Sequence, residues 1–435
     1  MSSENSAYQE VREQEDRSKN LGRGGLLVLG LQHAFTMFGA TVLVPYLTGV
    51  PVNVALFTAG IGTLLFHLLT KWKVPVFLGS SFAYIAPINA VILYHANVPE
   101  IYESVPEAIA AGFSITPDMI AYATGGILIA GLVQVAIAML IKRLGVSMFE
   151  KIFPPAVAGT IIAVIGLNLA PTAISMASSN WWIAIVSLGT AVFVRLYAKG
   201  FTRLIPVMCG IVVGYIVAAI TGNVTFDAVS QASWVGLPQF VLPKFSFYSL
   251  TVLVPVALAP TIEHFADIFA VSAVVGKKYY EDPGIHRTLA GDGIATAVAG
   301  FFGGPANTTY SENTGVLAIT KVFNPVVMRI AAVFAIILSF VPKVGALIQS
   351  IPTAVMGGIE ILLFGMIAAI GMKTLIENRV KVDGKNLIII SVMLVVGIGG
   401  AAIGIGPVRF EGIGLAALVG LLLNGIFVMT KAPEE

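Results

Sequence analysis

The sequence predicts an all-α polytopic membrane protein, and three observations support that fold class. Hydrophobic residues make up 57% of the 435 residues, charged residues only 11%, and the mean hydropathy of +0.90 is strongly positive. Apolar segments of membrane-spanning length, about 20 residues each, recur from Leu26 onward. Lys and Arg gather in alternate connections between these segments, which is typical of a chain that crosses a bilayer many times.

The apolar segments number about fourteen, and several are short or interrupted by Gly and Pro. Residues 1–24 precede them and are polar and mixed in charge, without the apolar region or cleavage site of a signal peptide. We expect a flexible cytoplasmic tail there. The predicted spans are centred near residues 36, 61, 84, 130, 160, 188, 212, 262, 294, 313, 333, 362, 395 and 421.

The distribution of basic residues tests this count, because cytoplasmic loops collect Lys and Arg. If the N-terminus is cytoplasmic, every basic residue except Lys244, Lys343 and Arg409 falls at a predicted cytoplasmic end. The long loop at 96–118 carries acidic residues but no Lys or Arg. One miscounted span would invert every later loop. Fourteen spans with both termini cytoplasmic is therefore the predicted topology.

An internal repeat organises the spans. Three pairs of similar segments occur in the same order in the two halves of the chain: 31–40 with 262–271, 79–87 with 307–315, and 153–160 with 351–358. Seven spans per copy is an odd number, so the second copy is inverted relative to the first. A 7+7 inverted repeat is typical of secondary transporters, whose broken helices carry the binding site near the bilayer midplane.

Acidic residues inside these apolar segments mark the candidate site. Glu263 lies in A-P-T-I-E-H-F-A-D-I-F-A, and Glu312 lies in the irregular stretch N-T-T-Y-S-E-N-T-G. An ionisable side chain at membrane depth is costly and usually functional. Asp267 follows Glu263 by one helical turn, so both carboxyl groups share one helix face. The sequence therefore predicts a polar binding site within the membrane.

Several other chemistries have no support in the sequence. The net charge of +2 is too small to indicate a nucleic-acid partner. The single Cys209 excludes internal disulfides and thiolate metal clusters. There is no G-x-x-x-x-G-K-[ST] phosphate loop, no His/Asp/Glu metal cluster and no convincing Ser/His/Asp set, so neither ATP-driven transport nor an intramembrane enzyme is expected. No metal or cofactor is predicted.

Specific motifs carry a resemblance to a known family: Q-H-A-F-T-M-F-G-A-T-V-L-V-P, G-S-S-F-A-Y, I-E-H-F-A-D, L-A-G-D-G-I-A-T, N-T-T-Y-S-E-N-T-G and I-P-T-A-V-M-G-G. From about Leu26 to about Thr430 the chain resembles the nucleobase/ascorbate transporters, also called the nucleobase:cation symporter-2 family. The E-N-T-G version of the second broken segment is similar to the uracil permease branch. Purine-transporting members typically have Gln where this chain has Glu312.

The resemblance implies a core domain and a gate domain, each built from both halves of the chain. Broken spans 3 and 10 would each contain a short strand, the two strands being antiparallel with the substrate between them. The expected boundaries are 25–145 (spans 1–4) and 246–345 (spans 8–11) for the core, and 146–245 (spans 5–7) and 346–435 (spans 12–14) for the gate.

The resemblance also implies a function. It predicts a secondary active transporter that imports uracil by proton symport, with alternating access between core and gate, as a homodimer in the cell membrane. A xanthine or purine symporter of the same family is the alternative, and sodium remains open as the coupled cation. A sulfate-permease-like anion transporter is a weaker alternative, because its anion site should favour positive charge where this chain has Glu312.

Site residues follow from the resemblance. Glu312 is expected to be the main recognition carboxylate, and Glu263 a second substrate contact that also couples protons. Asp267 is expected to share in coupling, although some uracil permeases have His at its position and a helix-packing role is equally open.

The remaining expected residues surround these acids. Backbone N–H groups at Phe82 and near Ser311 would donate to the uracil carbonyls, and Tyr310 would contact the substrate. His33, Asn313 and Asp292 are expected to support the site by hydrogen bonds between core helices. Glu360 has no predicted role.

Overall fold

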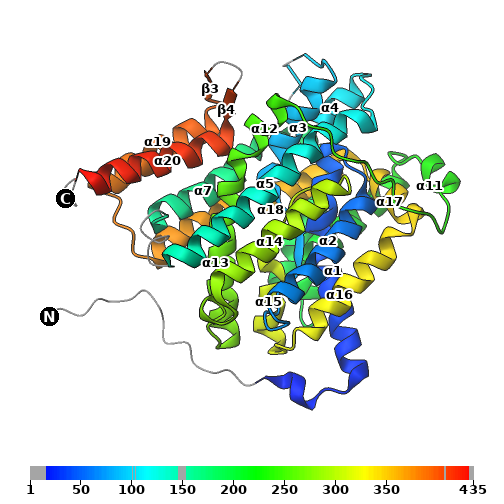
Figure 1. Ribbon diagram of the computed structural model, residues 1–435. Coiled ribbons are helices and arrows are strands. Elements are labelled where there is room, and N and C mark those ends of the chain that lie inside the picture. Colours follow the sequence, from blue (N-terminus) through cyan, green and yellow to red (C-terminus); the bar gives the residue numbers. More distant parts are fainter. Residues whose placement is uncertain (1–15, 100, 103, 146–152, 406–407, 431–435) are drawn as a thin grey trace.

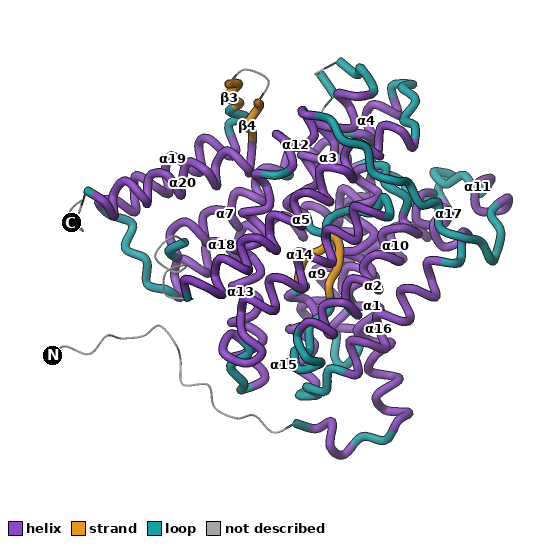
Figure 2. Tube along the Cα trace, in the orientation of Figure 1, coloured by secondary structure: helices purple, strands orange, loops and turns teal. Residues whose placement is uncertain are grey.

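The computed structural model describes residues 16–99, 101–102, 104–145, 153–405 and 408–430. Helices form most of it (Figure 1), and they surround a short strand pair (Figure 2). Within the described residues, seven helices are long and apolar enough to cross a membrane, and one bent helix pair makes an eighth candidate. A multi-pass helical membrane protein is thus confirmed, whereas the count of fourteen spans stays a prediction.

Each predicted span centre falls on a helix or on a strand-and-helix unit. In the first half these are α1 (Arg23–Thr48), α2 (Val52–Leu69), β1 (Leu78–Ser80) with η2 (Phe82–Tyr84) and α3 (Ile85–His95), α5 (Pro117–Leu144), α7 (Pro155–Asn168) with α8 (Ala170–Ser178), α9 (Trp181–Tyr197) and α10 (Pro206–Ile220). In the second half they are α12 (Phe247–Leu253) with η4 (Pro255–Ala257) and α13 (Leu258–Val275), α14 (Ile285–Phe301), β2 (Asn307–Thr309) with α15 (Ser311–Thr320), α16 (Val326–Ser339), α18 (Thr353–Glu377), α19 (Gly384–Ile398) and α20 (Gly412–Met429).

Proline and glycine set several helix boundaries. Pro117 and Pro206 occupy the first turns of α5 and α10, where a missing N–H costs no helical hydrogen bond. The helices α1 and α13 end at Gly49 and Gly276, which adopt the left-handed conformation with φ of 71° and 76°.

The strands β1 and β2 pair in antiparallel register, with Gly79 opposite Thr308. Two further backbone bonds extend the pair, from Ser81 N to Ala306 O (2.8 Å) and from Tyr310 N to Phe77 O (3.1 Å). Gly79 is required because a Cβ there would lie 2.4 Å from the ring of Tyr310. The segments 79–87 and 307–315 were expected to be irregular. Each instead contributes residues to a short strand and to the helix that follows it.

Two threonines hold the outer edges of this strand pair. Thr63 of α2 accepts from Leu78 N (2.9 Å) and donates to Leu78 O (3.3 Å). Thr296 of α14 accepts from Asn307 N (3.2 Å) and donates to Asn307 O (2.7 Å). Buried backbone groups need such partners. Both edges of the pair are thus fixed to neighbouring helices.

Small residues allow the closest helix contacts. A Cβ on Gly131 of α5 would lie 2.4 Å from the backbone of α14, at Ala297 N, and one on Gly371 of α18 would lie 2.3 Å from Ala163 N of α7. Such close approach is typical of membrane helices. The helix α14 also neighbours α2, which packs against α16, whereas α18 packs against α7, α8 and α9.

Several elements were not predicted. The loop at 96–118 contains a short helix, α4 (Val105–Ala110), which begins at the cap Ser104. The connection between α19 and α20 forms a hairpin of β3 (Ala402–Ile405) and β4 (Val408–Glu411). Further short elements are η3 (Thr202–Leu204), α11 (Asp227–Gln231), η5 (Tyr280–Gly284) and α17 (Pro342–Gln349), which is bent 85° from α16.

The prediction of a flexible tail is wrong for its last part, whereas residues 1–15 lie outside the described residues. Residues 17–20 form the helix η1 (Arg17–Asn20), capped by Asp16. The Asp16 carboxylate also accepts from Phe323 N (3.1 Å), and Arg17 N donates to Lys321 O (2.9 Å). Hydropathy alone does not reveal these contacts, because they join segments about 300 residues apart.

Candidate functional site

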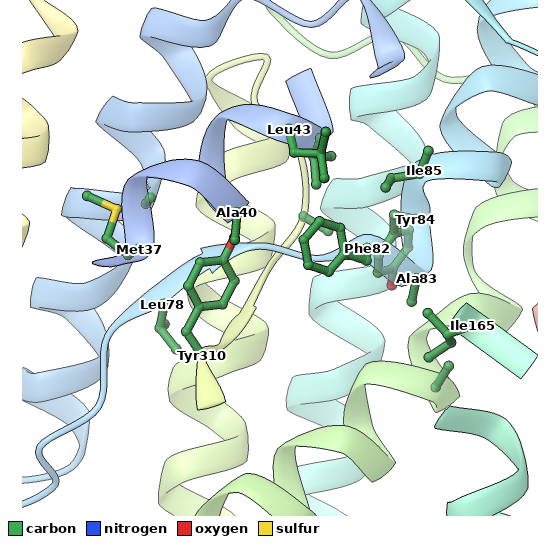
Figure 3. Packing of buried hydrophobic residues seen from close by; sticks show 14 of the residues in the cluster. Met37, Ala40, Leu43, Leu78, Phe82, Ala83, Tyr84, Ile85, Ile165 and Tyr310 are labelled. Carbon is green, nitrogen blue, oxygen red and sulfur yellow. The ribbon is translucent and has the colours of Figure 1, made fainter. Parts of the chain in front are cut away.

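A cavity of about 340 Å³ lies beside the strand pair. One wall comes from α1, η2, α13, β2 and α15, and the other from α7, α9, α10 and α18. The elements of the first wall carry all the acidic residues of the lining. Figure 3 shows the Tyr310 ring beside Ala40 of α1, with Phe82 of η2 nearby.

The helix α13 places two carboxyl groups on the cavity wall. Glu263 and Asp267 both line the cavity and are partly exposed, together with Ala266 between them. Their four-residue spacing puts them on one face of α13, as predicted. Thr309 of β2 donates to Asp267 Oδ2 at 2.7 Å. Asp267 is therefore tied directly to the strand pair.

The third carboxyl group stands at the start of α15. Glu312 lies in the first turn of this helix, and Ser311 beside it is exposed to the cavity. No side chain caps the helix start at Tyr310. The first N–H groups of a helix have no partner within it. The cavity thus combines acceptors on Glu312 with backbone donors from the same turn.

Two aromatic residues complete the central part of the lining. Phe82 begins η2, and its ring packs edge-to-face against Phe364 of α18, with centroids 6.3 Å apart. Tyr310 lines the cavity, but its hydroxyl donates to Ser80 O at 3.0 Å. Tyr310 therefore presents its ring rather than a free hydroxyl to a ligand.

The three residues expected to support the site lie outside the cavity lining. Asn313 Nδ2 is 3.0 Å from His33 Nδ1 and 3.3 Å from His33 O, which ties α15 to α1. Gln134 Nε2 donates to Asp292 Oδ2 at 3.5 Å, which ties α5 to α14. Asp292 also lies 3.8 Å from His264, and all of these side chains are buried.

Sequence reasoning missed part of the lining. Thr309 and the apolar residues Leu363 and Met366 of α18 line the cavity without having been predicted to do so. The apolar wall has no signal in a sequence where apolar residues predominate. Thr309 lies within the predicted irregular stretch 307–315, so its polarity at membrane depth was the available clue.

The cavity extends toward one end of the molecule. Its lining there includes Arg195, and a second hollow that shares Leu204 and Ile319 continues to Lys199 and Arg203. At the opposite end, α1 meets the segment before α18, where the Tyr46 hydroxyl donates to Ile351 O at 2.9 Å. The second hollow thus continues the cavity toward the basic end, and the Tyr46 hydrogen bond joins α1 to the segment before α18 at the opposite end.

Among the described residues, no group of three or more His, Cys, Asp or Glu side chains is placed to bind a metal ion. The cavity is instead lined by carboxyl groups and backbone N–H groups, together with two aromatic rings. Such a set suits a small planar molecule that both donates and accepts hydrogen bonds.

Comparisons with known proteins agree with this architecture. The family model for xanthine and uracil permeases, described as the Permease family, matches residues 24–405. The probable uracil permease of Pasteurella multocida (strain Pm70) is 45% identical over 413 residues, covering 93% of this chain and 94% of that protein. The uracil permease of Bacillus caldolyticus is 44% identical, covering 92% and 91%.

A solved structure shares the fold. The murine solute carrier 26 family member A9, an anion transporter in the inward-facing state, superposes with a TM-score of 0.65 over 93% of this chain and 68% of that one. The two are 14% identical, so the likeness concerns the fold alone.

Proposed function

Because the chain belongs to the nucleobase:cation symporter-2 (xanthine/uracil permease) family, we propose that it is a secondary active transporter that imports uracil together with a proton. The observation that carries the proposal is the gathering of Glu263, Asp267 and Glu312 in one cavity beside the strand pair. Both relatives described above are named uracil permeases.

The cavity chemistry supports uracil as the ligand. Uracil is planar and neutral, with two N–H donors and two carbonyl acceptors. The Glu312 and Glu263 carboxylates accept from the ring N–H groups, and backbone N–H groups at Phe82 and Ser311 donate to the carbonyls. The Tyr310 ring supplies an apolar surface. A buried site that satisfies every polar group rejects a molecule lacking one of them.

Proton coupling rests on the crowding of carboxyl groups. Three ionised carboxylates around one cavity within a membrane repel one another, and the low dielectric strengthens that repulsion. A proton on the Glu263 and Asp267 pair removes much of it and leaves Glu312 free to accept from uracil. Thr309 of β2 donates to Asp267, so protonation of Asp267 changes a hydrogen bond to the strand beside the substrate site.

Alternating access rests on the two groups of helices. In the proposed division the core comprises residues 25–145 and 246–345, and the gate residues 146–245 and 346–435; within these ranges, 100, 103, 146–152, 406–407 and 431–435 lie outside the described residues. Both proposed units contribute residues to the cavity lining. With the basic end cytoplasmic, the present conformation opens inward, and the contact of α1 with Ile351 closes the outer side.

The cell membrane is the proposed location, with both termini cytoplasmic and two copies forming a homodimer. Exposed apolar side chains on α9 and α10, such as Trp182, Phe193 and Ile216, are suited to contact lipid or the second copy. Cross-linking in intact membranes, with and without detergent, tests the dimer.

Binding and uptake by purified protein test the proposal. We expect radiolabelled uracil to bind, thymine, xanthine and adenine to compete weakly, and proteoliposomes to accumulate uracil when an inward proton gradient is imposed. Effective competition by xanthine would assign the chain to the purine-transporting branch. Uptake that ignores the proton gradient but follows a sodium gradient would refute proton symport.

A further inference from the structure

Glu360 of α18 is a buried acid outside the cavity. Its side chain is 0% exposed, and neither carboxyl oxygen has a hydrogen-bond partner among the described residues. It does not line the cavity. An ionised carboxylate without a partner is strongly disfavoured in such a place. The carboxyl group is therefore neutral, with its proton bound, in this conformation.

The position of Glu360 links it to the closed outer end of the cavity. Leu363 and Phe364 follow it by one turn on the same face of α18; Leu363 lines the cavity, and the ring of Phe364 meets that of Phe82. In the other direction, Tyr46 contacts the segment before α18 through Ile351. Tyr46 is the ionisable group that α1 contributes to this contact. Glu360 thus lies where the core and the gate meet.

Few other titratable groups face this carboxyl. The helices α7 and α8, which pack against α18, contain no ionisable residue. On α9 the charged group is Arg195, at the open end of the cavity. On α10, Tyr215 is engaged with Ser350 Oγ at 2.7 Å, and Cys209 is a partly exposed thiol. On α18 itself, Lys373 and Glu377 pair at the far end.

We propose that Glu360 is a second proton-binding site, which holds its proton while the outer contact of α1 with α18 is closed and releases it to the outer solution when that contact opens. The inference rests on the proposed transport cycle. Opening would admit water to Glu360, where the ionised form is stable. Closure would require the proton back, so an acidic outer solution favours the closed outer end.

This proton differs from the one coupled to uracil. It enters and leaves on the same side, so no charge crosses the membrane through Glu360. The cavity acids set the number of protons carried per uracil. Glu360 instead sets how the balance between the two conformations depends on the outer pH. Its substitution should leave uracil binding and the proton-to-uracil ratio intact.

Thiol labelling measures the opening directly. In a Cys209→Ala background, Ile351→Cys places a thiol at the closed outer contact, where Ile351 is 8% exposed. The backbone oxygen that bonds Tyr46 is retained. Asn223→Cys, at an exposed position, reports how pH alone changes thiol reactivity. Labelling at 351 is divided by labelling at 223 at each pH, after uracil binding has been verified at both ends of the pH range.

With Glu360 present, the ratio should rise roughly tenfold or more between about pH 5.5 and about pH 8.5, because one proton is released on opening. Glu360→Gln should keep the ratio low and independent of pH, and Glu360→Asp should restore the dependence. If Glu360→Gln does not fold, Glu360→Met should give the same flat profile.

A labelling ratio that does not change with pH, in protein that retains Glu360 and binds uracil, would overturn the inference but not the proposed function. So would a Glu360→Gln variant whose labelling ratio changes with pH as it does in the protein that retains Glu360. Failure of the parent to bind uracil would instead refute the proposed function, and with it the cycle on which the inference rests.

Discussion

We propose that ligand recognition depends most strongly on the Glu312 carboxylate. A hydrogen bond to a charged group contributes about 1.5–3 kcal/mol. We therefore expect Glu312→Gln to weaken uracil binding roughly 10- to 150-fold, measured by equilibrium binding to purified protein. Glu377→Gln, an exposed acid paired with Lys373, is the matched control and should bind uracil normally. Equal uracil affinity in the two variants would show that the Glu312 carboxylate does not contribute to recognition.

At the residue scale, the sequence predicted the acids better than their partners. Glu263, Asp267 and Glu312 interrupt apolar segments, and the structure places all three on one cavity. Their roles stay predictions. The bond from Thr309 to Asp267 and the ring contact of Phe82 with Phe364 were not predictable, because each joins segments distant in the chain.

The strand pair depends on one close approach between its two strands. An alanine at position 79 would bring its Cβ within 2.4 Å of the Tyr310 ring, which the hydroxyl bond to Ser80 holds in place. Overpacking of this kind costs about 1–3 kcal/mol. We expect Gly79→Ala to lower the melting temperature and to weaken uracil binding. Thermal unfolding and uracil titration of the same preparation measure both effects.

Gly365→Ala is the control for this substitution, because no atom lies within 4 Å of the added Cβ on α18. It should leave uracil affinity unchanged and make the helix more stable by about 1 kcal/mol. If both alanine variants bound uracil alike, the strand geometry would not determine affinity.

The helix η1 gives a pH-dependent contact outside the membrane spans. Burial raises the pKa of Asp16, but hydrogen bonds from the backbone N–H groups of Ser18 and Phe323 lower it. Together these bonds outweigh burial, so the pKa lies below its ordinary value. A carboxyl group with a lowered pKa stabilises the folded contact above its ordinary pKa, and this contribution is lost as pH falls through the lowered value.

Asp16→Ala should therefore release η1 at neutral pH. Loss of a helix cap costs about 1 kcal/mol, so hydrogen exchange at Phe323 should become roughly fivefold faster. Asp227→Ala, at the exposed start of α11, is the control and should not change exchange at Phe323. Unchanged exchange in Asp16→Ala would show that Arg17 and the backbone hold the segment alone.

The proposed transport cycle requires the core to move against the gate. A Cβ on Gly39 of α1 would lie 3.4 Å from Val207 Cβ of α10, close to the spacing of a disulfide. In a Cys209→Ala background, the pair Gly39→Cys and Val207→Cys should lose most uracil uptake on oxidation and regain it on reduction. Proteoliposome uptake before and after each treatment measures this.

The control cross-link joins two helices of the gate. A Cβ on Gly210 of α10 would lie 3.0 Å from Ala191 Cβ of α9 and 2.7 Å from Ser187 O of the same helix, so the two helices must move apart slightly to accept a disulfide. Oxidation of Gly210→Cys with Ala191→Cys should leave uptake largely intact. Equal inhibition by both cross-links would argue against movement between the two units.

At the scale of the whole molecule, hydropathy and the basic residues predicted the class of fold, because both reflect contact with lipid and water. The repeat at 79–87 and 307–315 located the broken segments. The sequence did not predict the elements that lie in the loops. The helix α4 is only six residues long, and the β3–β4 hairpin lies between two apolar segments. The number of spans and the core and gate boundaries stay predictions.

The threonine bonds at the two edges of the strand pair have a thermodynamic consequence. Thr63 and Thr296 attach β1 and β2 to α2 and α14, so the ligand-facing backbone moves as one piece with those helices. A ligand then meets the same donors and acceptors whichever side of the membrane it comes from. Its dissociation constants on the two sides should be similar.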